Sequence, residues 1–246
     1  MSLAIKVTDL NMAYADGIEV LRGFSHSFDA GSFTAIVGPS GCGKSSLLRI
    51  LAGLQSPSSG EIEANPDTSI GYVFQEPTLL AWRTVYENVA LPLKIKGFNK
   101  QQINNRIADA LALVGLADRQ HALPRELSGG MKMRVSLARA LAQNPDVLFM
   151  DEPFSALDEL TRLKLDDELL DIWRRQKCTI LFVTHTVSEA TYLAERVLVM
   201  SPNGRLKDDI QIESKTRNDA FRASPEFHEA RLKITKSLEQ NDEAIS

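Results

Sequence analysis

Cysteine is scarce in this 246-residue chain, which has only Cys42 and Cys178. Two cysteines supply neither a disulfide framework nor the spacing of a zinc site, so we expect free thiols in a reducing, cytosolic setting. Long apolar runs are also missing: no apolar stretch approaches the roughly 18 residues that a membrane-spanning helix needs. We therefore expect any membrane association to go through a partner.

An excess of positive charge is absent as well, since 28 basic residues stand against 32 acidic ones and the formal net charge is -4. This balance gives no overall positive field that would attract nucleic acid or anionic lipid, and we expect no nucleic-acid partner. The hydrophobic fraction of 43% is typical of a globular protein, not of a disordered one. The length allows one large domain, or a core domain with a smaller insert.

The order of the expected elements predicts an α/β protein. Polar and apolar residues alternate over the first thirty or so positions, which favours an antiparallel β layer. Helices separate the later apolar strands, and this pattern indicates a buried, mainly parallel sheet. We expect those strands at 33–37, 71–74, 147–150, 179–183 and 196–200.

A helical pattern replaces the strands between residues 85 and 142. One apolar face there is formed by Ile103, Ile107, Ala110, Leu111 and Val114. We interpret 85–142 as a helical subdomain inserted into a core made of 1–84 and 143–205. Charged residues dominate after that point, so 206–246 is expected to be a charged C-terminal extension.

A glycine-rich loop at residues 38–45 carries the strongest chemical signal. It reads Gly38-Pro39-Ser40-Gly41-Cys42-Gly43-Lys44-Ser45 and matches G-x-x-x-x-G-K-[ST], with an expected strand before it and an expected helix after it. Such a loop lets backbone N–H groups converge on phosphate oxygens, and the helix adds its positive N-terminal end. We expect this loop, together with Ser46, to bind ATP. Lys44 would reach the β- and γ-phosphates and Ser45 would ligate Mg²⁺.

Two adjacent carboxylates, Asp151 and Glu152, follow the apolar strand 147–150. In a protein with a phosphate-binding loop, Asp151 would hold Mg²⁺ through water, and Glu152 would polarise the water that attacks the γ-phosphate. A solvated pair at a strand end is the structural alternative.

The segment Leu127-Ser128-Gly129-Gly130-Met131, called the signature segment below, precedes a predicted helix. Its serine hydroxyl and glycine amides would lie at a helix N-terminus, which attracts anions. Taken alone, Ser-Gly-Gly is more simply an N-cap with a flexible entry.

Together these three motifs resemble the nucleotide-binding subunit of ATP-binding cassette (ABC) proteins over residues 3–205. The resemblance implies a single ABC ATPase domain: a P-loop NTPase (RecA-like) core with a mainly parallel sheet, an antiparallel β layer and a helical insert subdomain. It also implies a homodimer in which Ser128, Gly129 and Gly130 of one copy meet the γ-phosphate of ATP held by the other copy. Met131 departs from the glutamine that many cassettes have at this position.

The same resemblance gives roles to four further residues. Tyr14 would stack on adenine, and Gln75 would sense the γ-phosphate and join the Mg²⁺ site. Asp158 would lie in the loop that crosses the dimer interface, and His185 would orient the γ-phosphate and water. Without the family, they are more simply an edge aromatic, a loop amide, a helix N-cap and a strand-end histidine.

Within the family, the segment 75–89 and the signature segment look most like importers of nitrate, sulfonates and taurine, a group that also serves pyrimidine precursors. This implies ATP hydrolysis that drives uptake through an integral-membrane permease docked near 75–88, with an extracytoplasmic solute-binding protein as an indirect partner. The location would be peripheral, on the cytoplasmic face of the plasma membrane. We expect Trp82 to anchor the permease contact; the alternative is a core tryptophan of the insert.

Two other functions stay open. A cassette ATPase of translation or DNA repair would usually carry tandem cassettes, a long coiled-coil insert or a basic face. A phosphate-loop kinase would leave the signature segment without a purpose.

A thiol at Cys42 is expected to make ATPase activity sensitive to alkylation.

Overall fold

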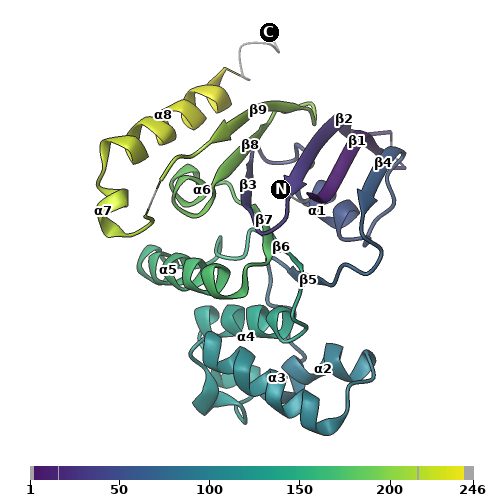
Figure 1. Cartoon of the computed structure of the whole chain (residues 1–246), viewed down its shortest axis with the longest axis vertical. Helices are drawn as coiled ribbons and strands as arrows, with labels where there is room; N and C mark the ends of the chain where they lie inside the picture. Colours follow the sequence, from purple (N-terminus) through teal and green to yellow (C-terminus); the bar gives the residue numbers. More distant parts are fainter. Residues whose placement is uncertain (1–2, 16, 215, 241–246) are drawn as a thin grey trace. The chain divides into compact units, whose positions relative to one another are not determined.

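The computed structural model describes residues 3–15, 17–214 and 216–240, which form two compact units (Figure 1). The first unit contains the residues up to 67 and those from 177 onward, and the second contains residues 68–176. The part of the chain that the structure describes includes no helix long and apolar enough to cross a lipid bilayer.

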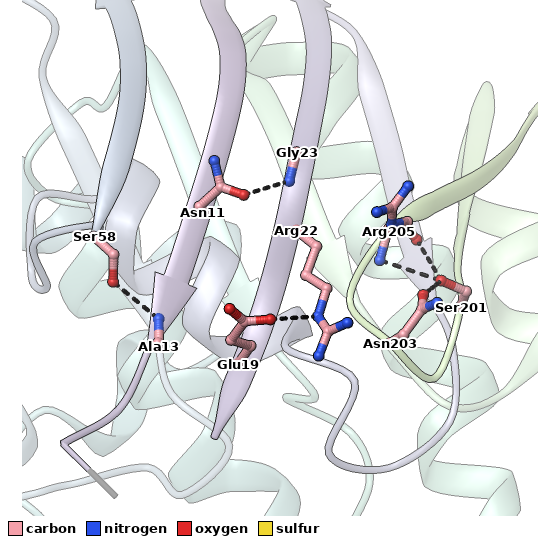
Figure 2. Close-up of polar contacts among 9 residues, drawn as sticks. All are labelled: Asn11, Ala13, Glu19, Arg22, Gly23, Ser58, Ser201, Asn203 and Arg205. Atoms are coloured by element: carbon pink, nitrogen blue, oxygen red, sulfur yellow. Dashed lines mark hydrogen bonds and ion pairs between the residues drawn. The ribbon is translucent and has the colours of Figure 1, made fainter. Parts of the chain in front are cut away.

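An antiparallel sheet opens the first unit. Its strands are β1 (Leu3–Ala13), β2 (Glu19–Asp29) and β4 (Ser59–Ala64), in the order β2-β1-β4. Side-chain amides and hydroxyls support this pairing: Asn11 Oδ1 accepts from the Gly23 N–H at 2.8 Å, and Ser58 Oγ accepts from the Ala13 N–H at 2.9 Å (Figure 2). The predicted antiparallel layer is therefore present, with β4 as an additional strand.

A second sheet of the first unit contains β3 (Phe33–Val37), which lies parallel to β7 (Thr179–Val183) on one side and to β8 (Arg196–Met200) on the other. Every residue of β3 and β7 is buried, as expected for apolar strands covered on both faces. An antiparallel strand, β9 (Leu206–Gln211), pairs with β8. The sheet thus continues past residue 205, into the stretch expected to be a charged extension.

Helices α1 (Lys44–Leu51) and α6 (Val187–Leu193) follow β3 and β7. The chain ends in α7 (Asp219–Arg222) and α8 (Pro225–Glu239), and α8 packs on α6 and β8 (Figure 1). Buried Arg217 donates to the carbonyls of Thr191 and Tyr192, at 3.0 and 2.8 Å, which fastens the segment before α7 to α6. Most of the charged residues described after position 205 thus belong to a strand and two helices of the first unit.

The second unit contains the parallel strands β5 (Ile70–Val73) and β6 (Val147–Asp151). Its remaining elements are the helices α2 (Val85–Ile95), α3 (Lys100–Leu113), α4 (Gly129–Leu141) and α5 (Glu159–Gln176), and the 3₁₀ turns η1 (Ala117–Arg119) and η2 (Pro124–Glu126). Helices α2, α3 and α4 pack against one another, and all five residues of the predicted apolar face around α3 are buried. The helical character predicted for 85–142 is therefore present, while the limits of the insert stay a prediction, because the compact unit runs from 68 to 176.

Local sequence explains where two of these helices begin. Thr84 Oγ1 accepts from the Glu87 N–H while the Glu87 carboxylate accepts from the Thr84 N–H, a reciprocal capping box at the start of α2. Asn99 and Gln102 form the same arrangement before α3. Each pair satisfies N–H groups that a helix start leaves without intrahelical partners.

Candidate functional site

The phosphate loop, residues 38–45, joins the buried strand β3 to α1. Gly43 is the N-cap of α1 with a φ of 94°, and a Cβ atom there would lie 2.1 Å from the Val20 carbonyl oxygen, so only glycine is accommodated. No side chain caps this helix start. A helix N-terminus capped by no side chain presents N–H groups and a positive dipole end to an anion.

Lys44 lies back along the same loop. Its buried Nζ donates to the Gly38 and Pro39 carbonyl oxygens, each at 2.9 Å. The ammonium is therefore held at the loop through main-chain acceptors. Contact with the β- and γ-phosphates stays a prediction.

Tyr14 follows the end of β1 and is 40% exposed. Its hydroxyl lies 2.8 Å from Ser46 Oγ, in the first turn of α1. Ser45, the expected Mg²⁺ ligand, is half-buried in that turn. The aromatic ring expected to stack on adenine is thus tied by its phenol end to the helix that follows the phosphate loop.

His185 is exposed, two residues after β7 ends. Ile36 of β3 pairs with Val183 of β7, and the Thr184 N–H donates to the Ile36 carbonyl oxygen at 3.2 Å. Because parallel strands place their carboxyl ends at one edge of a sheet, His185 and the phosphate loop leave the sheet at the same edge. Its predicted role in orienting the γ-phosphate stays a prediction.

The two carboxylates lie at the end of β6, in the second unit. Asp151 is buried and accepts a hydrogen bond from the Tyr72 hydroxyl of β5 at 3.4 Å. Glu152 is half-buried and has a φ of 44°. A left-handed backbone costs a non-glycine residue about 1–2 kcal/mol, and such strain gathers at functional positions. Asp151 is therefore not a solvated strand-end residue, whereas Glu152 stays partly exposed.

Gln75 lies near these carboxylates. Val73 pairs with Met150, so Gln75 leaves β5 at the edge where Glu152 leaves β6. Gln75 Nε2 lies 3.3 Å from Ser155 Oγ, and that hydroxyl donates to the Glu152 carbonyl oxygen at 2.9 Å. One serine thus links the expected γ-phosphate sensor to the backbone of the expected general base.

The signature segment begins α4. Exposed Ser128 is the N-cap, and its Oγ accepts from the Met131 N–H at 3.3 Å. A Cβ atom on Gly130 would lie 2.9 Å from Thr161 Cγ2, and the Thr161 N–H donates to Asp158 Oδ1 at 3.0 Å. The signature segment and Asp158 therefore lie close together. Ser128 and Asp158 each accept a hydrogen bond from a backbone N–H at a helix start, which is the capping role that local sequence predicts.

Cys42 differs from the reactive thiol expected at this position. The side chain is only 2% exposed, and burial raises its pKa, although the Lys44 ammonium acts in the opposite direction. A buried thiol with a raised pKa forms little thiolate, so alkylation is expected to be slow. Cys178 is buried as well, and both cysteines are free thiols, as expected.

The first unit brings together Tyr14, the phosphate loop and His185, and the second brings together Gln75, Asp151, Glu152 and the signature segment with Asp158. Sequence reasoning gave no supporting role to Tyr72 or Ser155, which hold the second group in place. Tyr72 had a signal, since it is a polar-tipped aromatic in an apolar strand. Ser155 belongs to the segment 155–158 that the resemblance assigns to the dimer interface, but no signal pointed to its contact with Gln75.

A strand, a phosphate loop and a helix, with a histidine at the same sheet edge, define a phosphate-loop nucleotide-binding protein. A family model described as "ABC transporter" matches residues 21–155. An ATP-binding protein of Brucella abortus is 46% identical over 83% of this chain and 82% of its own length. The nitrate import ATP-binding protein NrtD of Synechocystis is 39% identical (95% and 94%), and the aliphatic sulfonates import ATP-binding protein SsuB of Bacillus cereus is also 39% identical (90% and 89%).

Solved structures agree. The cbiO1 protein of Clostridium perfringens, part of the ABC transporter complex cbiONQ, superimposes with a TM-score of 0.79 at 28% identity, covering 96% of this chain and 97% of its own. The ABC transporter cassette MJ0796, solved as a dimer and in a post-hydrolysis state with ADP and Pi, gives 0.75 at 30% identity (85% and 99%). The chain belongs to the ATP-binding cassette transporter family, as an ATP-binding subunit with ATPase activity. The predicted α/β phosphate-loop fold is confirmed.

Proposed function

We propose that this chain is the ATP-hydrolysing subunit of an ABC importer that energises the uptake of a small solute through a partner permease. Relatives named for nitrate and aliphatic sulfonate import support a nitrate- or sulfonate-like solute. A taurine-like solute or a pyrimidine precursor is proposed from the resemblance of segment 75–89 and the signature segment alone. The observation that carries the proposal is an exposed tryptophan on a loop that the buried side chain of Asn88 holds by hydrogen bonds. An aromatic presented in this way is typical of a protein-binding surface.

Trp82 is 75% exposed, so it is not a core residue of the helical unit. Its loop is held by Asn88 of α2, which is 1% exposed. Asn88 Oδ1 accepts from the Leu80 N–H at 2.8 Å, and Nδ2 lies 3.1 Å from the Arg83 carbonyl oxygen and 2.9 Å from that of Thr84. The loop therefore loses little conformational entropy when a partner covers the indole.

Arg139 of α4 holds the preceding stretch of chain. Its guanidinium donates to the Thr78 carbonyl oxygen at 2.8 Å and to that of Pro77 at 2.9 Å. Burial lowers the pKa of Arg139, yet a guanidinium stays charged at neutral pH. The helix that begins at Ser128 thus also holds the segment following Gln75, which gives a direct mechanical link between the signature segment and the proposed docking loop.

ATP is proposed to bind with its phosphates on the loop amides and Lys44 and with its adenine on Tyr14. Mg²⁺ prefers oxygen ligands, and the hydroxyl of Ser45, the carboxylate of Asp151 and the amide of Gln75 are of that type. When bound, the ion would neutralise charge on the phosphates. Lys44 supplies a second positive charge for the same purpose.

Hydrolysis is assigned to Glu152, which polarises the attacking water, with His185 orienting that water and the γ-phosphate. We further propose a head-to-tail homodimer in which the signature segment of one copy covers the ATP bound by the other, with Asp158 at the interface. Ser128 and Asp158 are both exposed, as a role between two copies requires. Closing and reopening this dimer would move the permease between its access states.

The Glu152→Gln variant tests the catalytic assignment. Because the amide cannot accept a proton, turnover should fall by about 10²–10⁴-fold while ATP binding is retained. Phosphate release and equilibrium ATP binding are measured on the same preparation. Turnover within twofold of the wild type would remove Glu152 from this role.

Reconstitution with a candidate permease of the nitrate or sulfonate importer type tests the transport assignment. Trp82→Ala should abolish permease stimulation of ATPase activity and leave basal activity unchanged, whereas Leu232→Ala, which removes an exposed apolar side chain from α8, should leave both unchanged. Equal stimulation of the wild type and the Trp82 variant would refute the docking proposal.

A further inference from the structure

The turn between β8 and β9, residues 200–205, is closed by its own hydrogen bonds (Figure 2). The Ser201 N–H donates to the Arg205 carbonyl oxygen at 2.9 Å, and the Gly204 N–H donates to the Ser201 carbonyl oxygen at 3.0 Å. Ser201 Oγ also bonds to the main chain of Arg205, donating to its carbonyl oxygen at 3.1 Å and accepting from its N–H at 3.2 Å. This part of the chain is therefore a rigid corner.

Gly204 of this turn presses against the start of β2. A Cβ atom on Gly204, whose φ is 75°, would lie 2.2 Å from the Val20 carbonyl oxygen and 2.6 Å from the Val20 carbonyl carbon. The Arg22 N–H donates to the Gly204 carbonyl oxygen at 3.1 Å. The main chains of the two segments are therefore in direct contact, with no room for a methyl group.

The same peptide group bears on the phosphate loop. A Cβ atom on Gly43 would lie 2.1 Å from the Val20 carbonyl oxygen, so this oxygen is flanked by Gly43 and Gly204. Val20 has little freedom to yield, because its neighbours Glu19 and Leu21 pair with β1. A displacement of the turn at Gly204 would therefore be passed on to Gly43.

A second contact joins the turn to the other end of the loop. A Cβ atom on Gly38 would lie 2.8 Å from the Met200 carbonyl oxygen. Met200 ends β8, and Val199 beside it pairs with Val37, which directly precedes the loop. The first and last glycines of the phosphate loop thus both rest on main chain that the β8–β9 turn fixes.

We propose that the β8–β9 turn positions the phosphate loop for nucleotide, with Gly204 as a positioning residue that acts through the Val20 carbonyl. Amides that bind phosphate must converge on its oxygens with sub-ångström accuracy, so a small shift of Gly43 weakens several hydrogen bonds at once. The inference rests on the proposed binding of ATP by this loop.

Comparison of Gly204→Ala with Gly53→Ala tests the inference. Gly53 also has a positive φ, of 70°, but no heavy atom lies within 4 Å of the position of its Cβ atom. Both variants place alanine at a strained φ and should lose some thermal stability without nucleotide. Only Gly204→Ala should weaken ATP binding, by about tenfold, the effect of losing one hydrogen bond to a charged group.

The measurements are the Kd for ATP and the rise in Tm that saturating ATP produces in the full-length protein. A merely structural role would lower Tm in both variants and leave the two Kd values equal, which would overturn the inference. If Gly204→Ala does not fold, Ser201→Ala decides, because it loosens the turn without adding atoms. A rise in Kd of about threefold supports the inference, and an unchanged Kd refutes it.

Lys44→Ala separates this inference from the proposed function. If the wild type fails to bind ATP, or if Lys44→Ala binds it with wild-type affinity, the proposed nucleotide site is wrong. If the wild type binds ATP and Lys44→Ala does not, an unaffected Gly204→Ala variant refutes the positioning role alone.

Discussion

Asn88 gives the most direct test of how the loop that carries Trp82 is held. The side chain is buried in α2, where Oδ1 accepts one N–H, and Nδ2 lies within 3.2 Å of three carbonyl oxygens, those of Leu80, Arg83 and Thr84. An amide group has only two N–H donors, so one of these contacts is shared. Asn88→Ala therefore removes about three full hydrogen bonds.

The expected loss of stability follows from these contacts. Three buried hydrogen bonds at about 1 kcal/mol each give about 3 kcal/mol. Alanine is a better helix former than asparagine by about 0.6 kcal/mol, which offsets part of this loss. The free energy of unfolding should therefore decrease by about 2–2.5 kcal/mol, with no change in the residues that we assign to ATP binding.

Urea denaturation of the full-length protein, followed by circular dichroism, measures this change. Asn105→Ala is the matched control, because Asn105 is exposed on α3, in the same compact unit, and its replacement should be neutral or slightly stabilising. Indole fluorescence of the folded Asn88 variant should also show a more mobile Trp82. A loss of less than about 1 kcal/mol for Asn88→Ala would refute the hydrogen-bond argument.

Three further predictions concern single side chains. Burial lowers the pKa of His26, although Asp209 acts in the opposite direction. As the pH falls, the unfolded chain therefore binds a proton at this histidine before the folded protein does, and the free energy of unfolding should decrease below about pH 6.5. His26→Gln should reduce this decrease in urea titrations, and an unchanged pH profile would contradict the assignment. Native Cys42 should react with iodoacetamide more slowly than a free thiol at the same pH, whereas rapid stoichiometric labelling would show that the loop opens. In urea unfolding, the Glu152→Gly variant should be more stable than the Glu152→Ala variant by about 1 kcal/mol, because glycine adopts a positive φ without strain. The opposite order of stability would exclude backbone strain at this position.

Local patterns in the sequence predicted most of the regular structure. Strands β3, β7 and β8 are short apolar runs, as strands that are buried on both faces must be. Helices α2 and α3 begin at capping residues that are recognisable in the sequence. β9 was not predicted, because Leu206–Gln211 carries three charged residues and only its pairing with β8 makes it a strand. Tertiary context, not local propensity, decides such an edge strand.

The candidate site divides in the same way. The phosphate loop and the signature segment are contiguous motifs, so the sequence alone located them and their helix starts. Contacts between distant residues were invisible, such as that of Ser155 with Gln75 or that of Tyr72 with Asp151. The burial of Cys42 was also unpredictable, since it depends on how tightly the loop packs. Function could be read from motifs, while the residues that hold those motifs in place required the fold.

The discontinuous first unit has a consequence for synthesis on the ribosome. Residues 68–176 are contiguous, so all of the chain that forms this unit is made before residues 177–246. The phosphate loop is translated early, but β3 finds its neighbours β7 and β8 only after residue 200 has emerged. A nascent chain stalled before that point therefore carries the full nucleotide-binding motif without the complete set of strands that flank β3.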